Sequence, residues 1–192
     1  MNLPAPTDKQ LLRKQIAALY KAHDKQELAC LSEKVTAKIE QCRWFAEARK
    51  IACFHSLSDE VNTLAFIEKW ANVKEIYLPV ILDDCRMELR RFMSGSKLSF
   101  NRYNIAEPLP GNCCGSEEVD LFLIPGVAFD RSLHRLGRGK GYYDRLLQNT
   151  AAKKVGLCFD FQLFDTVPSD AHDIAMDALF TPSEMLFASN SK

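Results

Sequence analysis

Asp120-Leu-Phe-Leu-Ile-Pro-Gly126 is the stretch that decides the predicted fold. Its strongly apolar run, stopped by the Pro-Gly pair, predicts a strand. Working outward, four further short runs predict strands, at residues 50–54, 75–79, 154–159 and 178–181. We expect Pro79 to end the second of these, because proline cannot donate a hydrogen bond to a strand ladder.

Helical patterns separate the predicted strands. The first begins at Thr7 and Gln10, which have the capping-box spacing, and continues to Tyr20. The others cover about 24–48, 63–71 and 141–148. Strands that alternate with helices indicate an α/β fold with a largely parallel sheet. The segment 86–92 alternates polar and apolar residues and predicts an antiparallel or edge strand, and 93–116 is rich in loops.

The position of the binding site follows from this sheet. Ligands of parallel sheets bind beyond the carboxyl ends of the strands. We therefore expect the site at the loops that follow Phe54, Pro79 and Ile124.

Composition narrows the class of protein. The 192 residues, 47% hydrophobic and 26% charged, predict one globular domain over residues 1–192. The 25 basic and 25 acidic residues balance, which disfavours a nucleic-acid partner. The longest apolar runs fall far short of the roughly 20 residues of a membrane span, so no membrane partner is expected.

Seven cysteines without a Cys-x-x-Cys pair, and no signal peptide, predict reduced thiols and a cytoplasmic location. Cys113 and Cys114 are expected to be exposed in a loop.

The segment from Arg131 to Arg145 carries the clearest chemical signal. Three glycines at 137, 139 and 141 lie among five cations, and Asp144 is the single acid, so the window carries a net charge of +4. Glycine lets backbone N–H groups approach phosphate oxygens, and a following helix adds its positive end. The spacing matches neither the Walker A loop nor the dinucleotide fingerprint. A phosphate-binding loop is favoured over a solvated surface turn.

Three other features have two readings each. Asp144 is suited to Mg²⁺ beside phosphate, or to the first turn of a helix. Lys9 and Arg13 share one helix face, which either binds an anion or is simply exposed to solvent. Glu60 follows a predicted strand and accepts from N–H groups of a ligand, or marks the entry to a helix.

A family resemblance is carried by Arg135-Leu-Gly-Arg-Gly-Lys-Gly-Tyr-Tyr-Asp144, preceded by Ile124-Pro-Gly-Val-Ala-Phe-Asp130. This string resembles the signature of the 5-formyltetrahydrofolate cyclo-ligase family. Shorter pieces follow in the family's order along nearly the whole chain, among them Ile105-Ala-Glu-Pro108 and His172-Asp173. One departure is visible: the family's usual glycine before the Arg-Leu-Gly is missing from Arg131-Ser-Leu-His134, which puts the geometry of that turn in doubt.

The resemblance implies a Rossmann-like three-layer α/β/α domain. It also implies an ATP- and Mg²⁺-dependent enzyme, a carbon–nitrogen ligase that cyclises 5-formyltetrahydrofolate to 5,10-methenyltetrahydrofolate through a phosphorylated formyl group. The implied ATP site is Lys9, Gln10, Leu11, Leu12, Arg13, Arg135, Leu136, Gly137, Arg138, Gly139, Lys140, Gly141, Tyr142 and Tyr143. The implied folate site is His55, Glu60, Arg138, Gly139, Lys140, Gly141 and Tyr142. Arg135, Arg138, Lys140 and Tyr143 would be catalytic, and Asp144 and Asp173 would bind Mg²⁺.

Two other functions remain open from the residues alone. A non-catalytic folate- or nucleotide-binding protein could keep the loop and lose turnover. A nucleic-acid binder could use the basic loop, although the neutral net charge disfavours it. We expect a monomer that acts on a small molecule.

Overall fold

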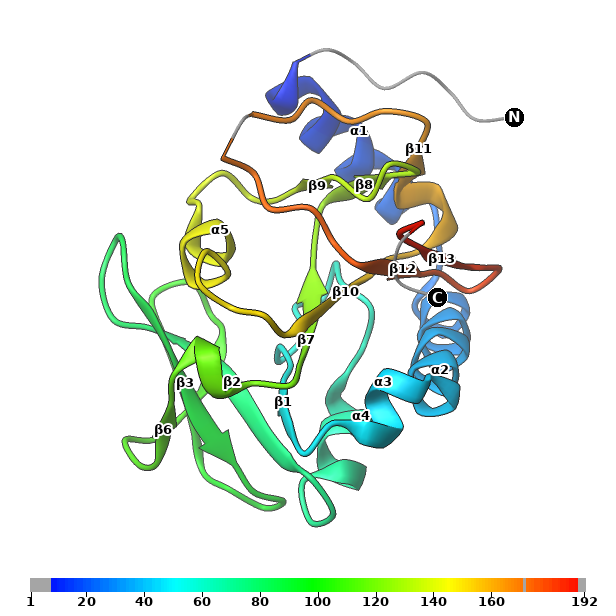
Figure 1. Ribbon diagram of the computed structural model, residues 1–192. Helices are drawn as coiled ribbons and strands as arrows, with labels where there is room; N and C mark the ends of the chain where they lie inside the picture. Colours follow the sequence, from blue (N-terminus) through cyan, green and yellow to red (C-terminus); the bar gives the residue numbers. More distant parts are fainter. Residues whose placement is uncertain (1–7, 171, 190–192) are drawn as a thin grey trace.

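The computed structural model describes residues 8–170 and 172–189, and Figure 1 shows the arrangement of its elements. The helices are α1 (Lys9–Lys21), α2 (Lys25–Gln41), α3 (Arg43–Glu47), α4 (Leu64–Trp70) and α5 (Tyr142–Leu146). The strands are β1 (Lys50–Ala52), β2 (Glu75–Ile81), β3 (Met87–Phe92), β4 (Leu98–Phe100), β5 (Ala106–Pro108), β6 (Cys113–Cys114), β7 (Leu121–Pro125), β8 (Ala128–Asp130), β9 (Arg135–Leu136), β10 (Lys153–Leu157), β11 (Leu163–Phe164), β12 (Ala178–Phe180) and β13 (Met185–Phe187).

An eight-stranded sheet forms the centre, in the order β13-β12-β10-β7-β1-β2-β3-β6. The five inner strands from β12 to β2 run parallel, whereas β13, β3 and β6 are antiparallel. The prediction of an α/β fold with a largely parallel sheet is confirmed. The alternation at 86–92 predicted an antiparallel or edge strand, and this is confirmed, because β3 pairs antiparallel with β2.

The chain changes direction across the sheet between β1 and β7. From β1 it proceeds to β2 on one side, then returns to β7 on the other side of β1 and continues outward to β10 and β12. Neighbouring strands whose connections leave in opposite directions open a crevice at their carboxyl ends, which is where such sheets bind ligands.

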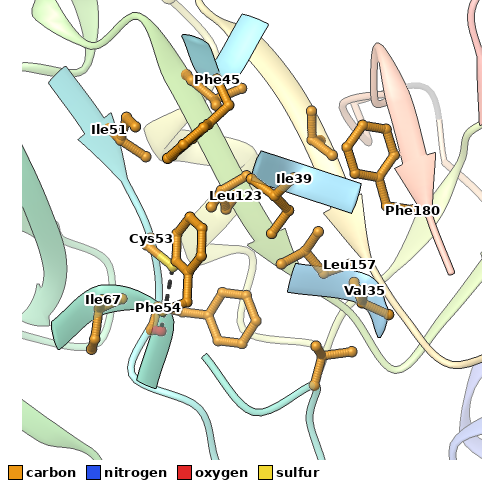
Figure 2. Packing of buried hydrophobic residues seen from close by; sticks show 14 of the residues in the cluster. Val35, Ile39, Phe45, Ile51, Cys53, Phe54, Ile67, Leu123, Leu157 and Phe180 are labelled. Carbon is orange, nitrogen blue, oxygen red and sulfur yellow. Dashed lines mark hydrogen bonds between the residues drawn. The ribbon is translucent and has the colours of Figure 1, made fainter. Parts of the chain in front are cut away.

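Hydrophobic packing fixes the layers on both faces of the sheet. On one face, Ile51, Leu123 and Leu157 pack against α2, α3 and α4, which contribute among others Val35, Ile39, Phe45 and Ile67 (Figure 2). α5 and its flanking loops lie on the opposite face of the sheet (Figure 1). The alternate residues of the same strands, such as Phe122 and Ile124, are buried there with Leu147 of the segment after α5. The two layers on either side of the sheet confirm the α/β/α arrangement, and among the described residues the second layer contains the short helix α5.

Pro79 does not end its strand. β2 continues to Ile81, and the Tyr77 carbonyl accepts from Cys53 on the β1 side. Two residues later Pro79 faces the same side, where β1 has already ended at Ala52, so the missing N–H costs no ladder bond.

The helical boundaries differ from the predictions in three places. Asp8 caps α1 by accepting from the backbone of Gln10 and Leu11, whereas the predicted cap Thr7 lies outside the described residues. The helix predicted over 24–48 breaks at Cys42, whose extended backbone lets its side chain join the core. The helix predicted at 141–148 is only Tyr142–Leu146.

One further correction concerns the cysteines. Cys114 is buried, because β6 pairs with β3 and turns that side chain inward, while Cys113 is exposed as predicted. All seven cysteines are free thiols. Within residues 8–170 and 172–189 no helix has the length and apolar character needed to cross a membrane.

Candidate active site

A cavity of about 420 Å³ opens at the carboxyl end of the parallel sheet. Its wall includes Phe54 after β1, Pro79 and Ile81 at the end of β2, and Pro125 and Gly126 after β7. The three loops at which we expected the site therefore meet around one cavity, at the crevice between β1 and β7.

The glycine loop between β9 and α5 forms one wall of this cavity. Gly139 and Gly141 have φ angles of 95° and 66°, a backbone conformation that favours glycine. The Arg13 side chain from α1 donates to the carbonyl of Gly137 at 2.9 Å and lies 3.3 Å from where a Cβ on Gly139 would be. The first helix is thus docked onto the loop through the basic residue that shares a face with Lys9.

Arg135 is the buried cation of the site. Its side chain is 5% exposed, donates to Asp144 at 2.8 Å, and lies over the Tyr143 ring at 5.4 Å. Its Nε has no hydrogen-bond partner in the described structure. A buried guanidinium with an unused donor beside a glycine loop fits an anionic ligand, because an unpaired buried donor is costly.

Arg138 links the glycine loop to the loop after β1. Its guanidinium contacts Asp59 at 2.6 Å and Glu60 at 3.2 Å, and Glu60 also accepts from the backbone N–H of Leu57. Burial raises the pKa of Glu60, although Leu57 and Arg138 act in the opposite direction. Burial opposes the charge of Arg138, but Asp59 and Glu60 outweigh it and raise its pKa.

Lys9 is held at the cavity by two acids from the far end of the chain. Its amine contacts Asp170 at 2.7 Å and Asp173 at 3.0 Å. Burial lowers the pKa of Lys9, but the two carboxylates prevail and raise it. The reverse holds for Asp173, where burial is outweighed by the Asp170 backbone N–H and Lys9, and the pKa falls.

Asp144 and Asp173, the two implied Mg²⁺ ligands, both line the cavity. Asp144 uses Oδ1 for Arg135, and Asp173 uses Oδ2 for Lys9 and the Asp170 backbone, so each keeps one oxygen outside these bonds. The described residues contain no group of three or more side chains that could hold a metal by themselves. The donor set fits a Mg²⁺ ion that takes one or two carboxylates and completes its shell with phosphate oxygens.

The aromatic and histidine side chains lie on the cavity wall as well. Tyr142 donates through its hydroxyl to the Asp83 carbonyl at 2.9 Å, which joins α5 to the turn after β2. Tyr143 is held against Arg135, and burial raises its pKa, so its hydroxyl is neutral at physiological pH. Burial lowers the pKa of His55, which keeps that ring neutral too.

The structure brings together most of the residues singled out from the sequence. The cavity is lined by Lys9, Arg13, His55, Glu60, Arg135, Leu136, Gly137, Arg138, Gly139, Lys140, Gly141, Tyr142, Tyr143, Asp144 and Asp173. Gln10, Leu11 and Leu12 do not line it: Leu12 lies on the buried face of α1, Leu11 is half exposed, and the backbone N–H of Gln10 donates to the Asp8 cap. Of the five cations in the loop window, Arg131 pairs with Glu184 and Arg145 bonds the carbonyls of Cys85 and Lys140, so neither lines the cavity.

Other lining residues were not singled out as ligands. They include Leu57, Ile81, Met87, Ile105, Glu107 and Asp170. Apolar residues at strand ends carry no local signal of a binding role. Glu107 lies within the family-like piece Ile105-Ala-Glu-Pro108, and Asp170 lies two residues before His172-Asp173, so these two acids could have been noticed. With them the wall holds five cations and five carboxylates, so the charge of the basic loop is balanced by acids from other elements.

The turn that lacks the family's usual glycine still contains a left-handed residue. Leu133 has φ of 71°, and its N–H bonds the Asp130 carbonyl at 2.9 Å. Its side chain is buried, and the Asp130 carboxylate accepts from the backbones of His134 and Val167. Packing and these bonds hold leucine in a conformation that costs roughly 1–2 kcal/mol, so the turn geometry survives the missing glycine.

The cavity lies at the switch point of a parallel sheet and is lined by a glycine loop and by the buried Arg135, whose Nε has no partner among the described residues. This arrangement is typical of α/β enzymes that bind phosphorylated small molecules. The chain belongs to the 5-formyltetrahydrofolate cyclo-ligase family, whose model matches residues 5–182. It is therefore an enzyme of the ligase type in folate one-carbon metabolism, and a ligase of this family implies the use of ATP.

Individual relatives agree with this assignment. The chain is 35% identical over 146 residues to the 5-formyltetrahydrofolate cyclo-ligase of Escherichia coli K12, which covers 72% of this chain and 80% of that protein. It is 29% identical over 205 residues to the mitochondrial enzyme of Arabidopsis thaliana, covering 91% and 74%. The solution structure of Aquifex aeolicus 5,10-methenyltetrahydrofolate synthetase matches with a TM-score of 0.87 at 34% identity, covering 96% of this chain and 94% of that one.

Proposed function

We propose that this enzyme cyclises 5-formyltetrahydrofolate to 5,10-methenyltetrahydrofolate and releases ADP and phosphate from ATP. The observation that carries the proposal is the single cavity that joins a glycine loop with Arg135, Arg138 and Lys140 to a half-buried acceptor, Glu60. Both substrates would lie in this space with their reacting atoms adjacent.

The cationic wall would bind the triphosphate. Arg13 fixes the glycine loop against α1, and the positive φ angles of Gly139 and Gly141 would let backbone N–H groups of the loop turn toward phosphate oxygens. Arg135, with its unused Nε, and the exposed amine of Lys140 would then face the charge that develops on the transferred phosphoryl group. Gln10, Leu11 and Leu12 lie outside the cavity wall, so any contact they make with ATP would come through the start of α1.

Glu60 would hold the folate. Its carboxylate lies at the cavity with Arg138 and the Leu57 N–H, and His55 stands nearby in its neutral form. An N–H donor of the reduced pterin ring is a suitable partner for a carboxylate acceptor. Tyr142 and Tyr143 would flank the reacting centre, and the neutral Tyr143 hydroxyl can donate to the formyl oxygen.

The chemistry has two steps. The formyl oxygen attacks the γ-phosphorus, the bond from that phosphorus to ADP breaks, and the lone pair of N5 forms a C=N bond, which gives a phosphorylated iminium. N10 then attacks the same carbon, loses its proton, and the C–O bond breaks to release phosphate. The formyl oxygen is a poor leaving group until it is phosphorylated, so ATP supplies the leaving group and no covalent bond to the enzyme is needed.

Mg²⁺ would be held by Asp144 and Asp173 together with phosphate oxygens, and it would neutralise charge on the triphosphate when bound. Arg135 and Lys9 orient these two carboxylates through their ion pairs. We further infer a single-domain monomer that works in a reducing compartment, since one chain supplies the whole cavity wall and the cysteines are free.

The test is to mix the purified protein with 5-formyltetrahydrofolate and MgATP and to follow the ultraviolet absorbance of the methenyl product. Growth of the product that requires ATP, and that stops when Mg²⁺ is chelated, is the expected result. Folate binding by calorimetry without any product would instead favour a non-catalytic binding protein. The absence of both would refute the proposal.

A further inference from the structure

Glu107 is a buried acid that the proposed reaction does not use. It is the middle residue of β5, is 6% exposed, and lines the same cavity as the glycine loop. Around it the wall is formed by the apolar side chains of Pro79, Ile81, Met87 and Ile105, which come from the end of β2, the start of β3 and the residue before β5. This part of the cavity is apolar except for one carboxylate.

Only one oxygen of Glu107 is engaged. Oε1 accepts from the backbone N–H of Ile81 at 2.9 Å and from the side-chain amide of Asn101 at 2.6 Å. No salt bridge to Glu107 occurs within residues 8–170 and 172–189, and Oε2 takes part in none of the hydrogen bonds found there. Oε2 is not among the fully buried polar atoms that lack a partner, so it remains accessible from the cavity, where a ligand N–H donor can bond it.

Glu60 differs in this respect. Both of its oxygens already have donors, Arg138 on Oε1 and the Leu57 N–H on Oε2. A ligand must share or displace these donors to bond Glu60, whereas it meets Oε2 of Glu107 without displacing any protein group. The apolar surroundings of Glu107 also suit a flat heterocyclic ring better than the charged wall that Glu60 shares with Arg138 and Asp59.

We propose that Glu107 is a second folate-binding residue, whose free carboxylate oxygen accepts a hydrogen bond from an N–H group of the reduced pterin ring seated between Pro79, Ile81, Met87 and Ile105. This assignment rests on the proposed function, since it takes the pterin of 5-formyltetrahydrofolate as the ligand. It makes Glu107 a specificity-determining residue that favours rings with an N–H donor at that edge.

The variant Glu107→Gln separates a folate-binding role of Glu107 from a purely structural one. The glutamine carbonyl can still accept from Ile81 and Asn101, so the packing of β5 against β2 is kept. The group that then faces the ligand is an amide NH₂, which donates and cannot accept. Glu88→Gln is the matched control, since Glu88 lies on neighbouring β3, pairs with Arg90 and does not line the cavity.

The test is calorimetric titration of the full-length protein with 5-formyltetrahydrofolate in the absence of ATP. We expect Glu107→Gln to raise the Kd about tenfold to hundredfold, with the Kd of Glu88→Gln and both melting temperatures close to wild type. Titration with p-aminobenzoylglutamate, which lacks the pterin, should give the same Kd in wild type and Glu107→Gln. An unchanged Kd for 5-formyltetrahydrofolate in Glu107→Gln would overturn the assignment.

Failure of the proposed function gives a different result from failure of this assignment. If the wild-type protein neither binds nor converts 5-formyltetrahydrofolate, the proposed function is wrong. If the wild type does both and Glu107→Gln binds as tightly, only the role of Glu107 is wrong. Equal weakening for 5-formyltetrahydrofolate and p-aminobenzoylglutamate would also overturn it, because the loss would then not come from the pterin.

Discussion

Replacement of Lys140 by alanine should separate catalysis from stability. Lys140 is exposed, lies between Gly139 and Gly141, and its amine makes no ion pair with any residue that the structure describes. Its backbone carbonyl, which accepts from Arg145 at 2.8 Å, is unaffected by the substitution. We therefore expect the free energy of unfolding to change by less than about 0.5 kcal/mol.

The effect on turnover should be far larger. A cation that faces the transferred phosphoryl group is worth about 3–4 kcal/mol in the transition state, which corresponds to a hundredfold to thousandfold loss of kcat. The folate KM should remain within about threefold, because the pterin is proposed to bond the carboxylates of Glu60 and Glu107 and not this amine. Turnover is measured by the ultraviolet absorbance of the methenyl product and stability by thermal melting.

Lys140→Arg is the control, since it keeps the charge and should retain more activity than the alanine variant. A kcat of Lys140→Ala within threefold of wild type would refute the reasoning that places this amine at the phosphoryl group. A large drop in melting temperature would refute the structural part, because it would require a side-chain contact of Lys140 that is not found among residues 8–170 and 172–189.

Three other changes probe the rest of the site. Asp144→Ala should raise the Mg²⁺ concentration needed for half-maximal turnover while the Kd for folate stays unchanged; a lower folate affinity with unchanged Mg²⁺ dependence would contradict its metal role. Arg135→Met should lower the free energy of unfolding by about 2–3 kcal/mol, because it leaves the carboxylate of Asp144 without its buried cation, and a urea titration that shows wild-type stability would refute this. Burial raises the pKa of Glu60 above its ordinary value of 4.5, so its charge costs stability at neutral pH and that cost disappears as the pH falls through the raised pKa. The folate KM should rise over the same pH range, because protonation removes the acceptor. Glu60→Gln should have a raised KM with no such dependence, and a parallel pH profile in both proteins would exclude Glu60 as the titrating group.

The parallel sheet could be predicted because its strands are short apolar runs buried on both faces. Segments such as 120–124 and 154–159 need no information from the rest of the chain to be recognised as strands. The three-stranded sheet of β8, β9 and β11 was not predicted, because strands of two or three residues have no detectable period. The prediction that Pro79 ends its strand was wrong for a related reason. A strand tolerates proline where no neighbouring strand needs its N–H, and the sequence does not show which neighbour faces that nitrogen.

Local spacing indicated the glycine loop, but the partners of its side chains come from distant segments. Arg138 pairs with Glu60, 78 residues away, and Lys9 pairs with Asp173, 164 residues away. Net charge over a window cannot reveal such pairing, so the loop looked more basic in the sequence than the cavity is in the fold. The contribution expected from a helix dipole is also smaller than the sequence suggested, since α5 has five residues.

In the proposed reaction the formyl oxygen is phosphorylated in this cavity before the ring closes. The most direct measurement uses 5-formyltetrahydrofolate labelled with ¹⁸O in the formyl group, with MgATP and the wild-type enzyme, followed by mass analysis of the released phosphate. One ¹⁸O atom is expected in each phosphate released per methenyl product formed. Unlabelled phosphate, with the ¹⁸O recovered in water, would contradict it.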